Sequence, residues 1–468
     1  MTTKLLLALA VCSIPLASCK VGPDYAAPQT QTPAEFAAGQ ARSSADAKQL
    51  AQWWTTLGDL QLSVLVADAL KNSPDAMEAA AKVRESRADL EAAGGILWPT
   101  ANAGAGVSRV GAGSGWGRNQ FRGGFDASWE LDVFGGLQRT LEAAGATYEA
   151  QAEQQRAVRM TLAAEVATRY VLLKGYESRL AIVRGNLAAQ TETLKLAESF
   201  FKAGLSTESP VLQARAQLAG LQSRVAPLEE SVATTRNNLA ALAGLQPGDK
   251  AFLPAVKLAA ADPAQIIPAG LPSDLLRRRP DVRAAERALA AATAGQGVAT
   301  AELFPKFSLT GSFAQSSARA GDLLDAGSRV WSVGPAVSFR LFDRSRLKAR
   351  VRAADARTEQ AGARYEKAVL TALSDTENAL ISCDRGRAQF QALTDTVAAS
   401  ERSVALATEL FDKGLGNFLD VLVTQRALFD AREQLEASRV QQTLNVVALY
   451  KALGGGWEEP AEKKEEKK

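Results

Sequence analysis

The sequence predicts a chain that combines very long α-helices with a few amphipathic β-strands and that completes its fold only together with further copies of itself. Three observations lead to this prediction: two long stretches lack proline, four short segments alternate between apolar and polar residues, and one stretch of the chain repeats another. A chain of 468 residues can also bury a large core, and its length alone suggests more than one structural unit.

Composition excludes several classes of protein. The chain has no histidine, so it cannot use Ser-His-Asp or Cys-His catalysis, a His-ligated zinc or a haem held by a proximal histidine. Its 54 Lys and Arg against 51 Asp and Glu give a formal net charge of +3, which is too weak a field to indicate nucleic-acid binding. We therefore expect no catalytic residue, no metal, no cofactor and no nucleic-acid partner.

The first element is an export signal, in which Lys4 is followed by an apolar run too short to cross a bilayer as a helix. Residues 16–19 resemble a bacterial lipobox, in which Cys19 becomes the lipidated first residue of the mature chain; the alternative is an ordinary signal peptidase site. Lys20, rather than Asp, after the cysteine implies transit to the outer membrane. The mature chain then keeps one further thiol, Cys383, so no intrachain disulfide is expected.

Four segments with a period of two residues predict β-strands. In the clearest, residues 121–133, apolar and aromatic side chains alternate with polar and charged ones. Residues 331–341 and 307–313 show the same alternation, and residues 101–107 show it weakly because alanine fills the apolar positions. Such strands suit either a soluble sheet with one wet face or a barrel with lipid outside and water inside. Four strands cannot close a barrel alone, so the barrel requires an oligomer.

Two proline-free stretches predict long helices. Residues 137–209 and 344–453 are free to be continuous helix, and both are rich in the good helix formers Ala, Leu, Glu, Gln and Arg. About 65 helical residues reach on the order of 100 Å, more than a compact domain needs. The prolines that crowd into residues 247–272 indicate a linker between two halves.

The two halves look alike. Residues 197–244 align without a gap with residues 407–454, at an offset of 210 residues (407 minus 197). Phe201 then matches Phe411, and a Gly-Leu pair, a Val-Leu pair and a final glycine match as well. The chain is therefore predicted to contain an internal duplication.

Six short motifs follow one another along the mature chain: Cys19–Tyr25; Trp53-Trp54 with Leu57–Asp59 and Leu62; Leu97–Pro99; Trp129–Gly135; Leu271–Asp281 with Ala285-Glu286; and Phe304-Pro305. Together they resemble the outer-membrane factor family, the TolC-like channels, and within it the NodT-like lipoprotein branch. The resemblance covers nearly all of the mature chain, and the motifs stand in the expected order.

The resemblance implies an α plus transmembrane β fold. It implies a homotrimeric channel in which each subunit gives four strands to a shared outer-membrane β-barrel and long helices to a periplasmic α-barrel. Its function would be that of a passive, lipid-anchored exit duct in a tripartite efflux pump for drugs or other small toxic compounds. Such a duct docks through a periplasmic adaptor onto an inner-membrane transporter, typically of the resistance-nodulation-division type. The alternatives are the exit channel of a type I protein-secretion system and a non-spanning, structural coiled-coil lipoprotein.

The expected organisation follows from these patterns and from the resemblance. Its segments are a signal peptide (1–18), a lipidated N-terminal segment (19–52), periplasmic helices of the first half (53–96), a barrel hairpin (97–136), tunnel helices of the first repeat (137–245), a Pro-rich linker (246–272), a helix of the second half (273–303), a second barrel hairpin (304–343), tunnel helices of the second repeat (344–455) and a disordered charged tail (456–468).

The resemblance also assigns site residues at the helical tips. In the family a repeated Gly-Leu motif lies where each helical hairpin turns, and the adaptor docks there; in this chain the motif is Gly204 with Leu205, and Gly414 with Leu415. Glycine suits the left-handed turn that closes a helix, and an exposed leucine offers an apolar knob to a partner helix. The alternative is a plain glycine C-cap, which would explain the glycines without a partner.

Asp420 stands where the family places a carboxylate ring that constricts the closed tunnel mouth. Three copies around a threefold axis would concentrate negative charge and favour cations. Some relatives carry a second acidic residue one turn later, but this chain has Val423 there, and the first repeat has Pro210 opposite Asp420. The alternative is that Asp420 is a helix N-cap or a first-turn acid that suits the helix dipole.

Overall fold

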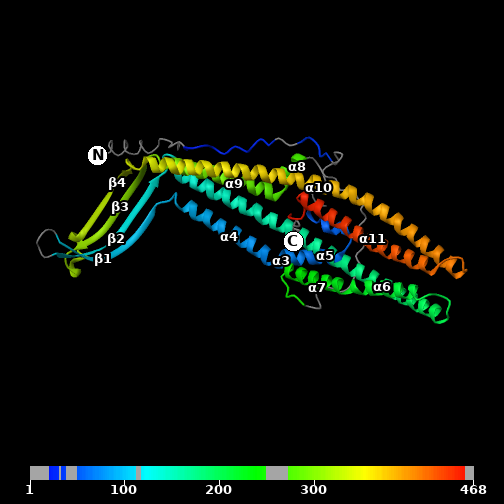
Figure 1. Ribbon diagram of the computed structural model, residues 1–468. Coiled ribbons are helices and arrows are strands. Elements are labelled where there is room, and N and C mark those ends of the chain that lie inside the picture. Colours follow the sequence, from blue (N-terminus) through cyan, green and yellow to red (C-terminus); the bar gives the residue numbers. More distant parts are fainter. Residues whose placement is uncertain (1–19, 31–32, 38–49, 112–116, 249–271, 459–468) are drawn as a thin grey trace, which may run out of the picture. The chain divides into compact units, whose positions relative to one another are not determined.

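A computed structural model of the chain describes residues 20–30, 33–37, 50–111, 117–248 and 272–458 (Figure 1). It contains two compact units, each of which is described by itself. Unit 1 comprises Met1–Thr30, Lys82–Ala152 and Ala284–Lys367, and unit 2 comprises Gln31–Ala81, Glu153–Arg283 and Ala368–Lys468. The signal peptide, Cys19, most of the expected linker 246–272 and the charged tail from residue 459 onward lie outside the described residues.

Unit 1 contains a four-stranded antiparallel sheet in the order β1-β2-β3-β4. The strands are β1 (Thr100–Val110), β2 (Arg118–Leu131), β3 (Lys306–Ser317) and β4 (Arg329–Ser338). Two hairpins, distant in the sequence, are joined through the pairing of β2 with β3. Two short 3-10 turns, Ala320–Asp322 and Ala326–Ser328, lie between β3 and β4.

The register of the sheet places apolar and polar side chains in separate rows. Phe125 lies opposite Phe313, which lies opposite Trp331, and the three side chains are exposed. In the adjacent row, Asp126 lies opposite Ser312, which pairs with Ser332. Because successive side chains of a strand point to opposite faces, one face of the sheet is apolar and the other polar, as the alternation predicts.

Four helices contribute to unit 1: α4 (Pro74–Gly95), α5 (Gly136–Lys202), α9 (Pro280–Ala301) and α10 (Arg344–Asp412). Proline begins both α4 and α9, and an aspartate follows in the first turn, where a missing N–H costs nothing and a negative charge suits the helix dipole. Small side chains of α9, among them the buried Ala290 and Ala294, allow close helix packing.

The proline-free stretches are helical but neither forms a single helix to its end. The first helix, α5, stops at Lys202, and the stretch 344–453 is divided into α10 and α11 (Phe418–Ala452). The division of the second stretch falls at Gly414 and Leu415, where the resemblance places a hairpin turn. Both α5 and α10 end just before a glycine with positive φ, which turns the chain back.

Unit 2 holds the larger apolar core. Its elements, besides the remainder of α4, α5 and α10, are η2 (Trp53–Leu57), α3 (Leu60–Asn72), α6 (Ser209–Ser223), α7 (Val225–Leu242), α8 (Pro272–Arg278) and α11. Trp53 is fully buried and stacks on Tyr450 with 5.2 Å between the ring centroids. The Tyr170 hydroxyl donates to Asp59 at 2.7 Å, and Asp59 in turn caps the N-terminus of α3. The core thus joins α3, α5 and α11.

Arg279 ties the start of the second half to this core. Its guanidinium is buried and pairs with Asp281 at 2.7 Å and with Asp375 of α10 at 3.2 Å, and it donates to the carbonyl of Ala452. Burial alone would lower the pKa of Arg279, but the two carboxylates outweigh it and raise the pKa. In unit 2 as well, the Trp457 ring lies 5.2 Å from the guanidinium of Arg156.

Over the described residues, the helices are all too short or too polar to cross a membrane.

Candidate functional site

The two hairpin turns of unit 2 are closed by the same backbone motif. The N–H of Leu205 donates to the carbonyl of Phe200 at 2.9 Å, and the N–H of Gly204 donates to that of Phe201 at 3.0 Å. The second turn repeats this pattern two hundred and ten residues later, with distances of 2.8 and 2.9 Å. The glycine φ angles are +71° and +73°. Both helices therefore end in Schellman motifs, which satisfy carbonyls that a helix end otherwise leaves unpaired.

The leucines of the two turns point into solvent. Leu205 is 72% exposed and Leu415 is 75% exposed, whereas the helix ends behind them share a small apolar cluster. In that cluster the ring of Phe411 packs against those of Phe200 and Phe418, at centroid distances of 5.4 and 5.1 Å. The plain C-cap explains the glycines, but it does not explain why two exposed leucines lie beside a partly buried aromatic cluster.

A cavity of about 360 Å³ opens between the two turns. Most of its lining residues are apolar or small, and Asp412 also lines it; the apolar ones are Ala197, Phe200, Leu205, Phe411 and Phe418. Its lining comes from both repeats, and it includes two of the four predicted docking residues, Leu205 and Gly414. Such a hollow can receive an apolar side chain from another helix.

Asp420 lies in the first turn of α11, and its side chain is exposed. The N-cap of the helix is Asn417, whose side chain accepts a hydrogen bond from the N–H of Leu419 at 3.1 Å. Asn417, and not Asp420, is therefore the N-cap of α11, and Asp420 is an acidic residue of the first turn. A carboxylate there is stabilised by the helix dipole, and it remains free to act on solvent or ions. Val423, one turn further, is also exposed.

The equivalent position of the first repeat has no carboxylate. Pro210 stands at the start of α6, and Glu208, the N-cap, makes no side-chain hydrogen bond to the helix. Proline fits the first turn because its missing N–H would be unpaired there in any case. The two turns therefore share their helix ends but not their helix starts.

Cys383 is packed rather than reactive. It lies half-buried against the apolar core of unit 2 and is a free thiol. Burial raises the pKa of the Cys383 thiol to about 11. The thiolate is the reactive form, so this residue carries no chemistry of its own.

Sequence reasoning missed an ion-pair cluster between the repeats. Arg224 lies at the break between α6 and α7 and pairs with Asp430 at 3.3 Å and with Glu433 at 2.6 Å. Glu433 also pairs with Arg179 of α5 at 3.0 Å. Pro227, which causes the break, was the available signal, but no pattern of spacing connects Arg224 with residues two hundred positions away.

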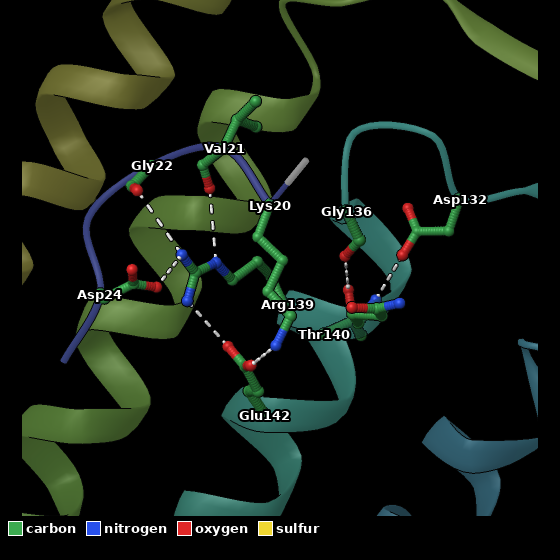
Figure 2. Close-up of polar contacts among 10 residues, drawn as sticks. Lys20, Val21, Gly22, Asp24, Asp132, Gly136, Arg139, Thr140 and Glu142 are labelled. Carbon is green, nitrogen blue, oxygen red and sulfur yellow. Dashed lines mark hydrogen bonds and ion pairs between the residues drawn. The ribbon is translucent and has the colours of Figure 1, made fainter. Parts of the chain in front are cut away.

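A second group that was missed surrounds Arg139, near the start of α5 (Figure 2). Its guanidinium is buried and contacts residues 21, 22 and 24, which belong to the motif Cys19–Tyr25. The motif itself was recognised, but its binding residue could not be found from spacing, since the two lie 115 residues apart.

Comparison with known proteins places this geometry in a family. The profile of the family described as "Outer membrane efflux protein" matches residues 65–245 and 271–455. Two similar proteins are the cation efflux system protein CusC of Escherichia coli, 32% identical over 96% of this chain and 98% of the relative, and the toluene efflux pump outer membrane protein TtgF of Pseudomonas putida, 32% identical over 95% and 96%.

A solved structure agrees with the fold. The outer-membrane channel OprN superimposes with a TM-score of 0.88, at 33% sequence identity, over 94% of this chain and 100% of that chain. The predicted fold, four antiparallel strands combined with long helices in the TolC-like arrangement, is thereby confirmed. The protein is an efflux channel of the outer membrane that extends into the periplasm, and it is not an enzyme. On the strength of the profile match and of these relatives, the chain belongs to the outer membrane efflux protein family.

Proposed function

We propose that three copies of the chain, lipidated at Cys19, form the passive exit duct of a tripartite pump that expels drugs or other small toxic compounds. The observation that carries the proposal is the open sheet of unit 1. Within the described residues, β1 and β4 each pair with a strand on one side only, which leaves a row of N–H and C=O groups unused. If β4 of one subunit pairs with β1 of the next, three sheets close into one barrel.

The two faces of the sheet support the same arrangement. The exposed row of Phe125, Phe313 and Trp331 suits contact with lipid, and the row of Asp126, Ser312 and Ser332 suits a water-filled interior. A soluble sheet would cover its aromatic face with other parts of the chain.

We further propose that Asp420 forms the gate. Its carboxylate is exposed and, among the described residues, has no ion-pair partner. Three such carboxylates around a threefold axis attract cations and narrow the mouth of the duct. The gate has a single ring, because Val423 occupies the position one turn later.

Planar-bilayer conductance of the purified trimer tests the pore and the gate together. We expect small cation-selective steps for the native protein and larger steps for Asp420→Ala. The matched control is Asp412→Ala, which removes an exposed carboxylate at the end of α10 instead. Equal steps in the native and Asp420→Ala trimers would disprove the gate, and silence from verified trimers of both would favour a non-spanning lipoprotein.

The adaptor docks at the two turns in this proposal. Leu205 and Leu415 are the knobs that a helical hairpin of the adaptor meets, and Gly204 and Gly414 hold them in place through the left-handed turn. The adaptor connects the duct to an inner-membrane transporter of the resistance-nodulation-division type. Support comes from the exposure of both leucines and from the apolar hollow beside them.

Crosslinking to the adaptor in cells tests the docking residues. The double variant Leu205→Asp and Leu415→Asp should lose the crosslink and the resistance that the pump confers, because a charge cannot enter an apolar contact. Leu324→Asp, a change at an 84% exposed leucine in the connection between β3 and β4, is the control. An unchanged crosslink in the double variant would remove the turns as the docking site.

The cargo is proposed to be small molecules rather than a secreted protein. The names of TtgF and CusC refer to toluene and to cations, and the lipobox with its Gly-Pro-Asp-Tyr continuation favours the efflux branch over protein secretion. Deletion of the gene should sensitise cells to solvents, antibiotics or metal cations. Loss of one secreted protein, with unchanged sensitivity, would support a type I secretion channel instead.

A further inference from the structure

The first described residues of the chain form an extended strap on unit 1. The strap, residues 20–30, has no regular secondary structure and runs beside α9 and α10, in blue in Figure 1. Its contacts recur along its length. The hydroxyl of Tyr25 donates to Glu286 of α9 at 2.9 Å, and that of Thr30 donates to Tyr365 of α10 at 3.1 Å. The strap therefore has a defined position rather than a random one.

Arg139 makes the densest of these contacts (Figure 2). Its side chain is only 4% exposed. It donates to the carbonyl of Val21 at 3.3 Å, to that of Gly22 at 3.5 Å and to the carboxylate of Asp24 at 2.6 Å, and a fourth bond reaches Glu142 at 2.9 Å. The planar fork of an arginine can serve several acceptors at once, which the point charge of a lysine cannot.

The charges of the strap match those of α5. Lys20 pairs with Glu142, and Asp24 pairs with Arg139, so a positive and a negative residue of the strap each meet the opposite charge. Burial alone would lower the pKa of Arg139 and raise that of Glu142. The hydrogen bonds within the cluster outweigh burial in both cases, which raises the pKa of Arg139 and lowers that of Glu142.

Glycines let the backbones approach closely enough for these bonds. Gly22 has a φ of +86°, and a Cβ built on it would lie 2.7 Å from the Cα of Gly297 on α9. A Cβ on Gly297 would lie 2.8 Å from the Cδ of Arg139, and one on Gly135 would lie 2.8 Å from the Cα of Lys20. At these three positions, only a residue without a side chain lets the strap and Arg139 pack this closely.

The strap also contacts the connection between the sheet and the first long helix. The N–H of Val21 donates to the carbonyl of Phe134 at 3.2 Å. Two residues earlier, Asp132 accepts a hydrogen bond from the N–H of Gln138 at 2.7 Å and so caps the start of α5. The strap therefore adds a backbone bond to a short turn that links β2 to α5.

We propose that Arg139 is the positioning residue that seats the strap, and that the seated strap holds the connection between β2 and α5 in place. Without the Arg139 side chain, the strap detaches from the start of α5, and the connection loses its backbone hydrogen bond from Val21. The inference does not rest on the gate, the docking turns or the cargo.

Hydrogen exchange of the full-length mature trimer tests the role of Arg139. In Arg139→Gln we expect the amide of Val21 to exchange about ten to a hundred times faster, because several hydrogen bonds to one charged group are lost. Arg139→Lys should lie between this variant and the native protein, since lysine keeps the charge but not the fork. Asp24→Asn should have a small effect, because the Asp24 side chain is 86% exposed.

A control on the same unit separates seating from general loosening. Arg350→Gln breaks an exposed ion pair with Glu302, in the turn that follows α9, and removes no hydrogen bond or ion pair of the strap. It should leave the exchange of Val21 unchanged. The proposal fails if Arg139→Gln leaves Val21 protected, or if Arg350→Gln exposes it equally. It also fails if the strap opens while the amides of residues 133–135 exchange at the native rate, because the connection would then be independent of the strap.

A glycine pair on α9 provides a test that changes no charge. Gly297→Ala places a methyl group against the side chain of Arg139, whereas a Cβ on Gly295 would meet nothing within 4 Å. Alanine favours the helix equally at both positions. We expect Gly297→Ala to release the strap and Gly295→Ala to leave it seated, and equal exchange in the two variants would contradict the close packing. Mass spectrometry of the N-terminal peptide reports lipidation separately, so an absent lipid is distinguishable from an unseated strap.

Discussion

The α5–α6 hairpin and the α10–α11 hairpin have the same turn, but the helices that follow their turns differ. At both turns a glycine with positive φ and a following leucine close the same pair of backbone hydrogen bonds. After the first turn, the chain returns in two pieces of 15 and 18 residues; after the second, it returns in one helix of 35 residues. The two repeats therefore share the structure of the turn but differ in the helix that follows it.

One residue accounts for the difference. Pro227 lies just after the break at Arg224, where it can neither donate a hydrogen bond to the carbonyl of Ser223 nor avoid that carbonyl with its ring. The equivalent residue of the second repeat, at an offset of 210 (437 minus 227), is Ala437, and α11 passes through it without interruption. The break places Arg224 where it pairs with Asp430 and Glu433 of α11.

The comparison teaches which features of the repeat are constrained together. The turns need the same glycine geometry on both hairpins, whereas each helix start is free to take a different residue. In the first repeat, α6 begins with a proline, and the chain after the turn forms ion pairs with α11. In the second repeat, the unbroken helix α11 has an exposed carboxylate in its first turn. Variants that exchange these features between the repeats can test the comparison.

The largest effect is expected from giving the second return the proline of the first. Ala437→Pro removes a backbone hydrogen bond in the middle of α11 and clashes with the carbonyl of Glu433, at a cost of about 3 kcal/mol or more. The free energy of local opening of α11, from hydrogen exchange, measures the effect. The reciprocal variant, Pro227→Ala, should increase amide protection across residues 224–228. If α11 opened no more easily in Ala437→Pro, proline would not be the cause of the break.

A smaller effect on the free energy of unfolding should distinguish the glycine of a hairpin turn, Gly204, from the glycine that ends α7, Gly244. Gly244 closes α7 with a φ of +73°, and a Cβ on it would lie 2.4 Å from the carbonyl oxygen of Asn72, whereas a Cβ on Gly204 would meet nothing within 4 Å. Gly204→Ala should therefore cost only the strain of the left-handed backbone, about 1–2 kcal/mol. Gly244→Ala should cost about 1 kcal/mol more through the clash. Thermal unfolding of the two variants side by side measures this, and equal shifts would show that the contact with Asn72 relaxes freely.

The smallest effect concerns the helix starts. Asn417→Ala removes the side-chain cap of α11 and should cost about 1 kcal/mol. Its counterpart, Thr207→Ala, should cost close to nothing, because Glu208 and not Thr207 is the N-cap of α6. Protection of the amide of Leu419, compared with that of Ser209, reports the difference. Comparable losses at both sites would mean that the two starts are capped alike in solution.

Much of the fold could be predicted from local patterns. The alternation over residues 121–133 predicted β2, and the absence of proline predicted α5 and α10, because strand faces and helix interiors restrict neighbouring residues directly. The pairing of β2 with β3 could not be predicted in this way, since Phe125 and Phe313 are distant in the sequence and no local rule selects the partner strand.

In the candidate site as well, local features could be predicted, and contacts between distant residues could not. The positive φ of Gly204 and Gly414 follows from the residue type and its place at a helix end, and both were predicted. The N-cap at Asn417 could not be told from an N-cap at Asp420 by residue type, because asparagine and aspartate are equally good caps. Arg139 was missed because a buried arginine is recognised only by the acceptors around it, and three of these belong to the distant strap.

The packed thiol of Cys383 makes the protein convenient for site-directed labelling. At pH 7 a thiol with a pKa of about 11 is ionised in about one molecule in ten thousand, against a few per cent for an exposed cysteine. A single cysteine placed at Leu205 or Leu415, both exposed, would therefore react with a maleimide dye while Cys383 stays silent. The two turns can be followed one at a time by fluorescence in the otherwise unaltered chain.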